Sequence, residues 1–141
     1  MKVQWAMLAN AAEVREGLVS VLGGAWDSIA ADGPGDDETP AAVLRGTLVM
    51  RLMLSREETD REHALEVRVV DADGQVLGRS SGTFTVAQNP ALPVGWDQGM
   101  VMNLNLTGVR LPRIGPYEVT VHIDNVFHHA LAFQVAQRPT G

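Results

Sequence analysis

The sequence contains no cysteine, only one lysine (Lys2) and few aromatic residues. The absence of cysteine excludes disulfide bonds, thiolate nucleophiles and cysteine-bound metal ions. No apolar run approaches the roughly 20 residues that a membrane-spanning helix requires. The chain also lacks the pattern of a signal peptide at its start. We therefore expect a cytoplasmic protein that associates with no membrane.

Positive charge is scarce and scattered. The formal net charge is −6, and the ten arginines form no cluster with each other or with the lysine. A protein that grips nucleic acid needs a basic face, because counterion release supplies much of that affinity. We therefore expect no nucleic-acid partner, and we interpret the negative charge as a contribution to solubility.

What the sequence does contain is alternation of apolar and polar residues. It is clearest in 116–123 and 127–135, which are joined by a short turn. A period of two is typical of a strand with one buried and one solvated face. The pattern recurs along the chain, and no amphipathic helix of ten residues interrupts it. The sequence predicts an all-β fold: a single domain over residues 1–141, built as an antiparallel β-sandwich, Ig-like or related, with about eight or nine strands.

The expected strands can be placed by residue number. The core of each lies at 3–8, 18–22, 43–55, 64–71, 75–78, 82–87, 100–106, 117–123 and 127–135. Residues 26–29 could continue the second strand. Residues 9–16 are ambiguous, since Ala11 to Val14 could form one helical turn.

Parity predicts the geometry of two hairpins. In the middle one, a three-residue loop over 72–74 with glycine in the left-handed position places Leu77 on the face of the preceding valines. In the last one, a two-residue turn would put the apolar sets of the two strands on opposite faces. We therefore predict a three-residue loop over 124–126. This register places Ile123 opposite Phe127, Val119 opposite Leu131, Tyr117 opposite Phe133 and His122 opposite His128.

Several short motifs carry a resemblance to a known family. They are Met7 to Ala12, Glu16-Gly17, Leu22 to Trp26, Asp71 to Gly74, Leu111-Pro112, Gly115 to Glu118 and Phe133 to Val135. In these motifs the chain resembles a bacterial family of small β-sandwich proteins known by a domain-of-unknown-function label, over nearly its full length. The motifs are turn and core signals. The resemblance therefore implies a single sandwich domain and no catalytic residues.

The histidines of the last hairpin are candidate metal ligands. Facing residues of paired strands have β-carbons about 4.5–5.5 Å apart, so His122 and His128 could share a metal ion, with Asp124 as a third ligand. Zinc normally takes at least three protein ligands. The alternative, which we favour, is a polar outer face without metal, and we expect no cofactor.

Two apolar features are candidate binding surfaces. Trp96 lies in a proline-rich loop, where it could anchor a protein or sugar partner or, as we favour, fold back as a lid over the end of the sandwich. The strand over 43–55 is apolar on both faces. Its outer face carries Val49, Arg51 and Met53, and needs cover from the loop at Asp32 or from another subunit.

The leading functional hypothesis is a non-enzymatic module that binds a protein partner or itself, as a homodimer. It rests on the absence of a catalytic set: no Gly-x-Ser-x-Gly elbow is present, and no histidine is paired in sequence with Ser80 or Ser81. A domain that binds a small molecule or carbohydrate through Trp96 is the alternative. A metal-dependent enzyme built on His122, His128 and Asp124 is the second alternative. The fold itself does not choose among them.

Overall fold

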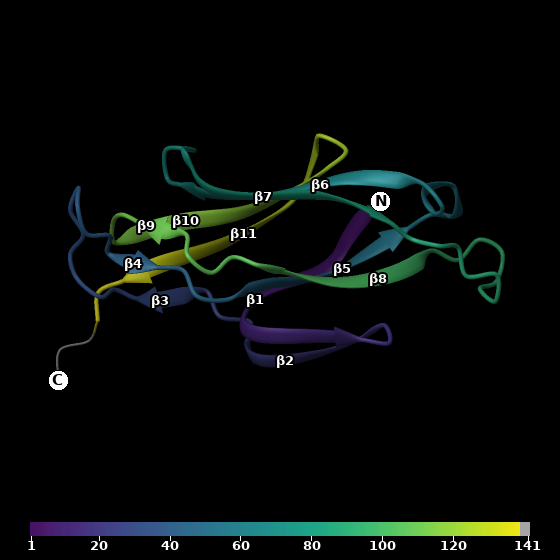
Figure 1. Cartoon of the computed structure of the whole chain (residues 1–141), viewed down its shortest axis with the longest axis horizontal. Coiled ribbons are helices and arrows are strands. Elements are labelled where there is room, and N and C mark those ends of the chain that lie inside the picture. Colours follow the sequence, from purple (N-terminus) through teal and green to yellow (C-terminus); the bar gives the residue numbers. More distant parts are fainter. Residues whose placement is uncertain (139–141) are drawn as a thin grey trace.

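The computed structural model describes residues 1–138, and within them the chain is all-β apart from one short 3-10 helix. Figure 1 shows most of the strands running roughly along the long axis of the molecule, in layers that lie one above the other. The elements are β1 (Lys2–Arg15), β2 (Leu18–Gly24), β3 (Ser28–Ala30), β4 (Ala42–Val43), β5 (Thr47–Leu54), η1 (Arg56–Glu58), β6 (Glu62–Asp71), β7 (Val76–Thr85), β8 (Gln98–Asn105), β9 (Arg110–Leu111), β10 (Gly115–Ile123) and β11 (Val126–Ala136).

Nine of these strands form two sheets that share one core. The first sheet has the order β2-β1-β5-β8, and the second has the order β3-β11-β10-β6-β7. The short strands β4 and β9 pair separately. The all-β prediction is confirmed and the arrangement is sandwich-like, with two differences from expectation. The described chain has eleven strands rather than eight or nine, and β3 runs parallel to β11.

The core lies between the two sheets and follows the alternation in the sequence. In β5 the inward side chains are fully buried, and in β10 the predicted inward set is buried as well. The burial of each large apolar side chain contributes roughly 1.5–3 kcal/mol to the stability of the fold. These residues are Leu48, Met50, Leu52 and Leu54 from one sheet, and Tyr117, Val119, Val121 and Ile123 from the other.

Strand β1 is continuous through the segment that the sequence left ambiguous. No helical turn forms at 11–14, because Ala11 to Arg15 pair with β2 in an antiparallel hairpin. Up to Ala9 the same strand pairs with β5. Beyond this point β1 bends, and the β1–β2 hairpin folds back along the first sheet (Figure 1). The Asn103 side chain of β8 donates a hydrogen bond of 2.9 Å to the Ala12 carbonyl, so the hairpin reaches across the outer face of β5.

The turn of the last hairpin is shorter than predicted, but the strand pairs far from the turn have the predicted register. The loop is a two-residue turn, because Ile123 pairs with Val126 while Asp124 and Asn125 both have positive φ, 52° and 65°. That is the backbone of a type I′ turn, which matches the twist of paired strands. A bulge between Val121 and His122 then restores the register. The predicted pairs Val119–Leu131 and Tyr117–Phe133 are confirmed, whereas the pairing of Ile123 with Phe127 is wrong.

The middle hairpin has the predicted three-residue loop. The Asp71 amide bonds to the Gln75 carbonyl, and Gly74 has a φ of 81°. The following strand is longer than expected: β7 is continuous over Val76–Thr85 instead of two strands. Small residues such as Ser80 and Gly82 are tolerated here because β7 is the outermost strand of its sheet.

The residues expected to prolong the second strand cross to the other sheet instead. β3 joins β11 through Ile29 and its neighbours. The Trp26 indole packs where the chain passes from one sheet to the other. Its ring centroid lies 6.3 Å from that of Phe133, edge to face at an interplanar angle of 86°. Its buried Nε1 finds no hydrogen-bond partner within residues 1–138, so the indole acts here as an apolar plug.

The long strand expected at 43–55 is interrupted at Gly46, which separates β4 from β5. Gly46 has a φ of 155°, and a β-carbon there would lie 2.5 Å from the Ala9 carbonyl oxygen. Only glycine allows the two backbones to approach this closely.

We expect Gly46→Ala to lower the free energy of unfolding by on the order of 2 kcal/mol, since the added methyl group must displace the β1 backbone. Gly82→Ala is the matched control, because a β-carbon there meets no atom within 4 Å and the φ of Gly82 is ordinary. The control should change stability by at most about 1 kcal/mol. Urea denaturation of both variants measures the difference. Equal stabilities would contradict the assignment of Gly46 as a close-approach site.

Candidate functional site

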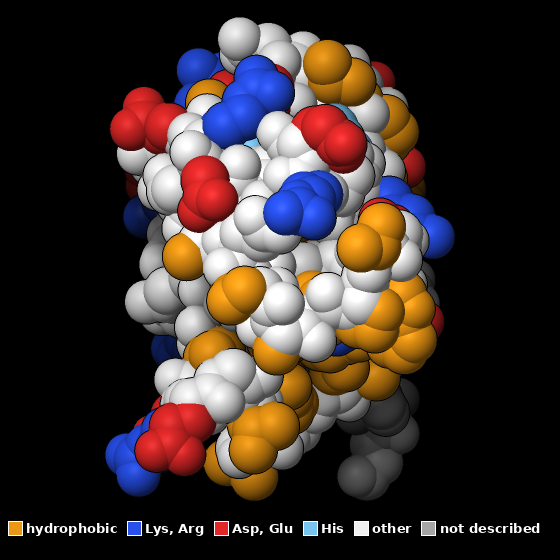
Figure 2. All heavy atoms as spheres, turned by 90° about the vertical axis from the view of Figure 1, so that its right-hand side faces the viewer, with side chains coloured by type: hydrophobic (Ala, Val, Ile, Leu, Met, Phe, Trp, Pro, Cys, Tyr) orange, Lys and Arg blue, Asp and Glu red, His pale blue; other side chains and the backbone are white. Residues whose placement is uncertain are grey.

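Two connections lie at one end of the molecule, on the right of Figure 1, and a third, nearer the middle of that view, is linked to the first of them through His63. They are η1, the loop between β7 and β8 over residues 86–97, here called the Trp96 loop, and the β10–β11 turn. Figure 2 views this end directly. Charged side chains concentrate in its upper half, and hydrophobic side chains gather mostly in its lower half. Loops at the end of a rigid β-scaffold are a common place for binding residues.

The Trp96 loop is held by side-chain hydrogen bonds rather than by apolar packing. Gln98 accepts a bond from the Asn89 amide at 2.9 Å and donates one to the Ala87 carbonyl at 2.8 Å. The Asn89 side chain accepts a bond from the Ala91 amide at 3.0 Å. The Trp96 amide closes a turn on the Pro93 carbonyl at 3.2 Å. These bonds define one conformation for the loop.

This conformation presents Trp96 to solvent. The residue is 65% exposed and its neighbour Val94 is 91% exposed. The interpretation of Trp96 as a lid is therefore wrong, because a lid would bury the indole against the sandwich. Trp96 instead borders a cavity of about 330 Å³, whose polar lining includes Arg56, Asn89 and Gln98. The volume lies at the lower end of the range for small-molecule sites.

The outer face of β5 is not an open surface. Val49 is fully buried, since the β1–β2 hairpin lies across this face. Arg51 is half-buried: it donates hydrogen bonds to the Gln4 side chain and to the sulfur of Met53. At Val49 the cover comes from within the chain, and the β1–β2 hairpin supplies it in place of the loop at Asp32. This face therefore offers Val49 to no partner.

The candidate metal ligands of the last hairpin are not brought together. The bulge places His122 opposite Phe127, with ring centroids 5.8 Å apart, instead of opposite His128. His128 Nδ1 lies 2.8 Å from the Val126 carbonyl oxygen. Burial lowers the pKa of His122, and the nearby Arg68 lowers it further. Across residues 1–138, no three side chains of the metal-binding types are grouped closely enough to hold an ion.

Asp124 instead binds His63, a contact that the sequence did not suggest. His63 is 4% exposed, and its Nδ1 lies 2.7 Å from the Asp124 carboxylate. Its Nε2 lies 2.7 Å from the Glu58 carbonyl oxygen. Both partners are acceptors, so the two contacts are satisfied together only when both ring nitrogens carry a proton, and the site favours the imidazolium form of His63. The ring lies on Phe84, and the Ala64 amide donates to the other Asp124 oxygen at 2.9 Å.

The pKa values of this pair shift in opposite directions. The hydrogen bond that the His63 ring donates to Asp124 raises the pKa of His63 above its ordinary 6.5, and the bond to the Glu58 carbonyl raises it further. The bond to His63 lowers the pKa of Asp124 below its ordinary 3.8, aided by the Ala64 amide. Each charge favours the other, so the pair fastens the β10–β11 turn to the start of β6 and to η1.

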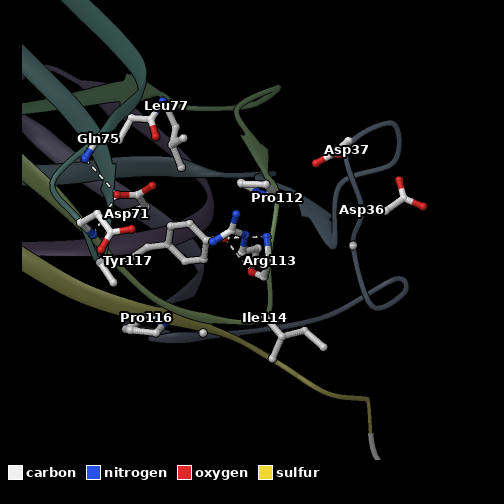
Figure 3. Close-up of a pocket in the computed structure, with 14 residues that line it drawn as sticks. Asp36, Asp37, Asp71, Gln75, Leu77, Pro112, Arg113, Ile114, Pro116 and Tyr117 are labelled. Carbon is white, nitrogen blue, oxygen red and sulfur yellow. Dashed lines mark hydrogen bonds between the residues drawn. The ribbon is translucent and has the colours of Figure 1, made fainter.

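Figure 3 shows a second concavity, of about 540 Å³. The β6–β7 turn and the connection from β9 to β10 line it, at the end of the molecule on the left of Figure 1. The Asp71 carboxylate accepts hydrogen bonds from the Gln75 and Asp73 amides, both at 2.9 Å, within its own turn. The Tyr117 hydroxyl donates to the Arg113 carbonyl at 2.6 Å and accepts from the Arg113 amide at 3.0 Å. These groups stabilise turns, and their hydrogen-bonding capacity is directed at the backbone.

The pH dependence of stability should report the His63–Asp124 pair. The raised pKa of His63 means that its contribution is complete below pH 6.5 and is lost as the pH rises through the higher folded value. The lowered pKa of Asp124 means that its contribution is present above pH 3.8 and is lost as the pH falls further. We expect maximal stabilisation by the pair between these values.

The measurement is urea denaturation across this pH range together with an NMR titration of the histidine rings. Asp124→Asn should lower the pKa of His63 and flatten the decline in stability on the alkaline side. His128→Asn is the control, because the hydrogen bond of the His128 ring goes to the backbone of its own hairpin and not to His63 or Asp124. A His63 titration that is the same in the wild type and in Asp124→Asn would contradict the assignment.

Comparison with known proteins identifies a family and adds no activity. No helix in residues 1–138 is long and apolar enough to cross a membrane. No curated protein matches the sequence. Residues 4–136 match a family described as a family of unknown function, DUF6941. Because the match spans most of the sequence, the chain belongs to the DUF6941 family.

Proposed function

We propose that this chain is a non-enzymatic binding module that docks a protein partner through the Trp96 loop. The exposure of Trp96 on a loop with a defined conformation is the observation that carries the proposal. Tryptophan is enriched among the residues that dominate protein interfaces. A loop that is already ordered loses little conformational entropy on binding. The partner would offer a shallow apolar pocket for the indole and for Val94.

Other features support a binding role over a catalytic one. The buried imidazole of His63 and the carboxylates of Asp71 and Asp124 are engaged in hydrogen bonds that fasten turns. The net charge of −6 favours a protein partner over nucleic acid or an anionic membrane. We place the protein in the cytoplasm, in keeping with its lack of cysteine. An Ig-like fold, with binding loops at one end of a sandwich, belongs to the same proposal.

Photo-crosslinking in the native host tests this docking surface. A photoreactive phenylalanine analogue in place of Val94 should give a discrete adduct with one protein. Trp96→Ala in the same chain should abolish the adduct, since loss of a central tryptophan costs about 2 kcal/mol or more, roughly a 30-fold loss of affinity. The same analogue in place of Thr83, which is exposed on β7, is the control. Adducts that survive Trp96→Ala, or none at position 94, would contradict the proposal.

The cavity beside Trp96 supports carbohydrate binding as a second candidate. A sugar ring could stack on the indole while Arg56 and Asn89 offer polar contacts. Titration with a panel of oligosaccharides, followed by the three indole N–H signals in NMR, distinguishes it from protein docking. We expect the Trp96 signal to shift while those of Trp5 and Trp26 stay in place. Trp96→Phe assigns the signal, and a panel that moves none of the three would rule out this candidate.

A further inference from the structure

Strand β2 leaves one long edge without a partner. Within residues 1–138 it is the outermost strand of its sheet and pairs only with β1. None of the backbone hydrogen bonds outside the described strand ladders involves residues 18–24. In Figure 1 β2 lies at the lower margin of the molecule, with the rest of the fold beyond β1. Its free N–H and C=O groups are therefore available to another strand.

The edge of β2 lacks the features that normally prevent such pairing. The strand contains no charged residue and no proline over its seven residues, Leu18–Gly24. Leu18 is 74% exposed and Leu22 is 71% exposed. Both point to the same face, since alternate residues of a strand share a side. An edge that is exposed, uncharged and apolar is a template for a further strand.

The sequence of β2 also indicates which strand would fit. Residues 18–22 read Leu-Val-Ser-Val-Leu, which is the same in both directions about Ser20. We propose that β2 pairs with β2 of a second copy of this chain, antiparallel, around a twofold axis that runs between the two copies of Ser20. Leu18 then lies opposite the Leu22 of the partner subunit, and the reverse holds at the other end. Such an interface is self-complementary, as a twofold dimer requires, and joins the two sheets into one.

Electrostatics favour this contact over other surfaces of the chain. Two copies each carry a net charge of −6, so they repel least where an uncharged strand meets its equivalent. Of the charges beside β2, Glu13 and Arg15 lie on β1 and form an ion pair of 2.9 Å with each other, while Glu16 lies in the β1–β2 turn, beyond the proposed leucine pairs. Strands are spaced about 4.8 Å apart, so in the dimer Glu13 and its equivalent are about 14 Å apart. The cross-strand leucine pairs each contribute a fraction of the association free energy.

Sedimentation equilibrium over a wide concentration range tests the dimer, and two double variants test its register. The wild type should show twice the chain mass of 15.2 kDa. Leu18→Glu with Leu22→Glu places like charges opposite each other at both ends and should give a monomer. Leu18→Glu with Leu22→Lys places opposite charges there and should keep the dimer. In both variants the glutamate at position 18 lies beside Arg15, the residue that pairs with position 18 in the hairpin. Both mutated positions are exposed, so the fold of the single chain should be kept.

The absence of cysteine allows a second, independent measurement. The two copies of residue 20 face each other across the proposed axis. Oxidation of Ser20→Cys should therefore link two chains through one disulfide. Leu18→Cys is the control, because Leu18 and its equivalent would be four residues apart along the strand, about 14 Å, beyond disulfide reach. A wild type that stays monomeric overturns the proposal, and a strand from a different protein would then be the occupant to seek. A dimer that both double variants retain, or equal cross-linking at 18 and 20, also overturns it.

Discussion

The structure depends on the burial of β5 on both of its faces. Its inner face meets the second sheet across the core, and its outer face, at Val49, is fully covered by the β1–β2 hairpin. A strand with two apolar faces cannot stand at the surface of a two-layer fold without such cover. The bend of β1 after Ala9 and the glycine at position 46 follow from this need, because they let one long strand first pair with β5 and then cross it.

The hairpin that covers β5 exposes apolar side chains of its own. The hairpin that shields Val49 has a second face, and this face carries Leu18 and Leu22 in solvent. A hairpin that packs on one sheet buries only the face that touches the sheet, because its side chains alternate between two opposite faces. The unpaired edge of β2 is therefore a consequence of how the core is closed. A contact between copies at this edge would complete a burial that the single chain leaves unfinished.

The fold could be predicted from the sequence in those segments where apolar and polar residues alternate. Most of the strand positions, the all-β class and the long-range pairs Val119–Leu131 and Tyr117–Phe133 follow from side-chain parity alone. Parity could not reveal the bulge before His122, because a two-residue turn with a bulge and a three-residue loop leave the distant pairs in the same register. The error stayed local, and it altered only the residues near the turn, including both histidines.

The site was less predictable because its contacts join distant residues. Trp96 could be named from its proline-rich loop, but its exposure depends on hydrogen bonds made by Gln98 and Asn89, which have no signature in the sequence. His63 and Asp124 are 61 positions apart and meet only because β6 pairs with β10. A polar residue next to a turn gives no indication of which distant strand will supply its partner.

The two proposed contacts occupy different parts of the molecule and place no steric demand on each other. β2 starts near the Trp96 end and runs away from it (Figure 1). In an antiparallel pair of β2 strands, the two chains would therefore point their Trp96 ends in opposite directions. Such a dimer could not bring both indoles onto one small partner, but it could bridge two partners or two sites on an extended one. Bridging raises apparent affinity only where the sites match that span, so the geometry of the dimer would select repetitive or extended partners over compact ones.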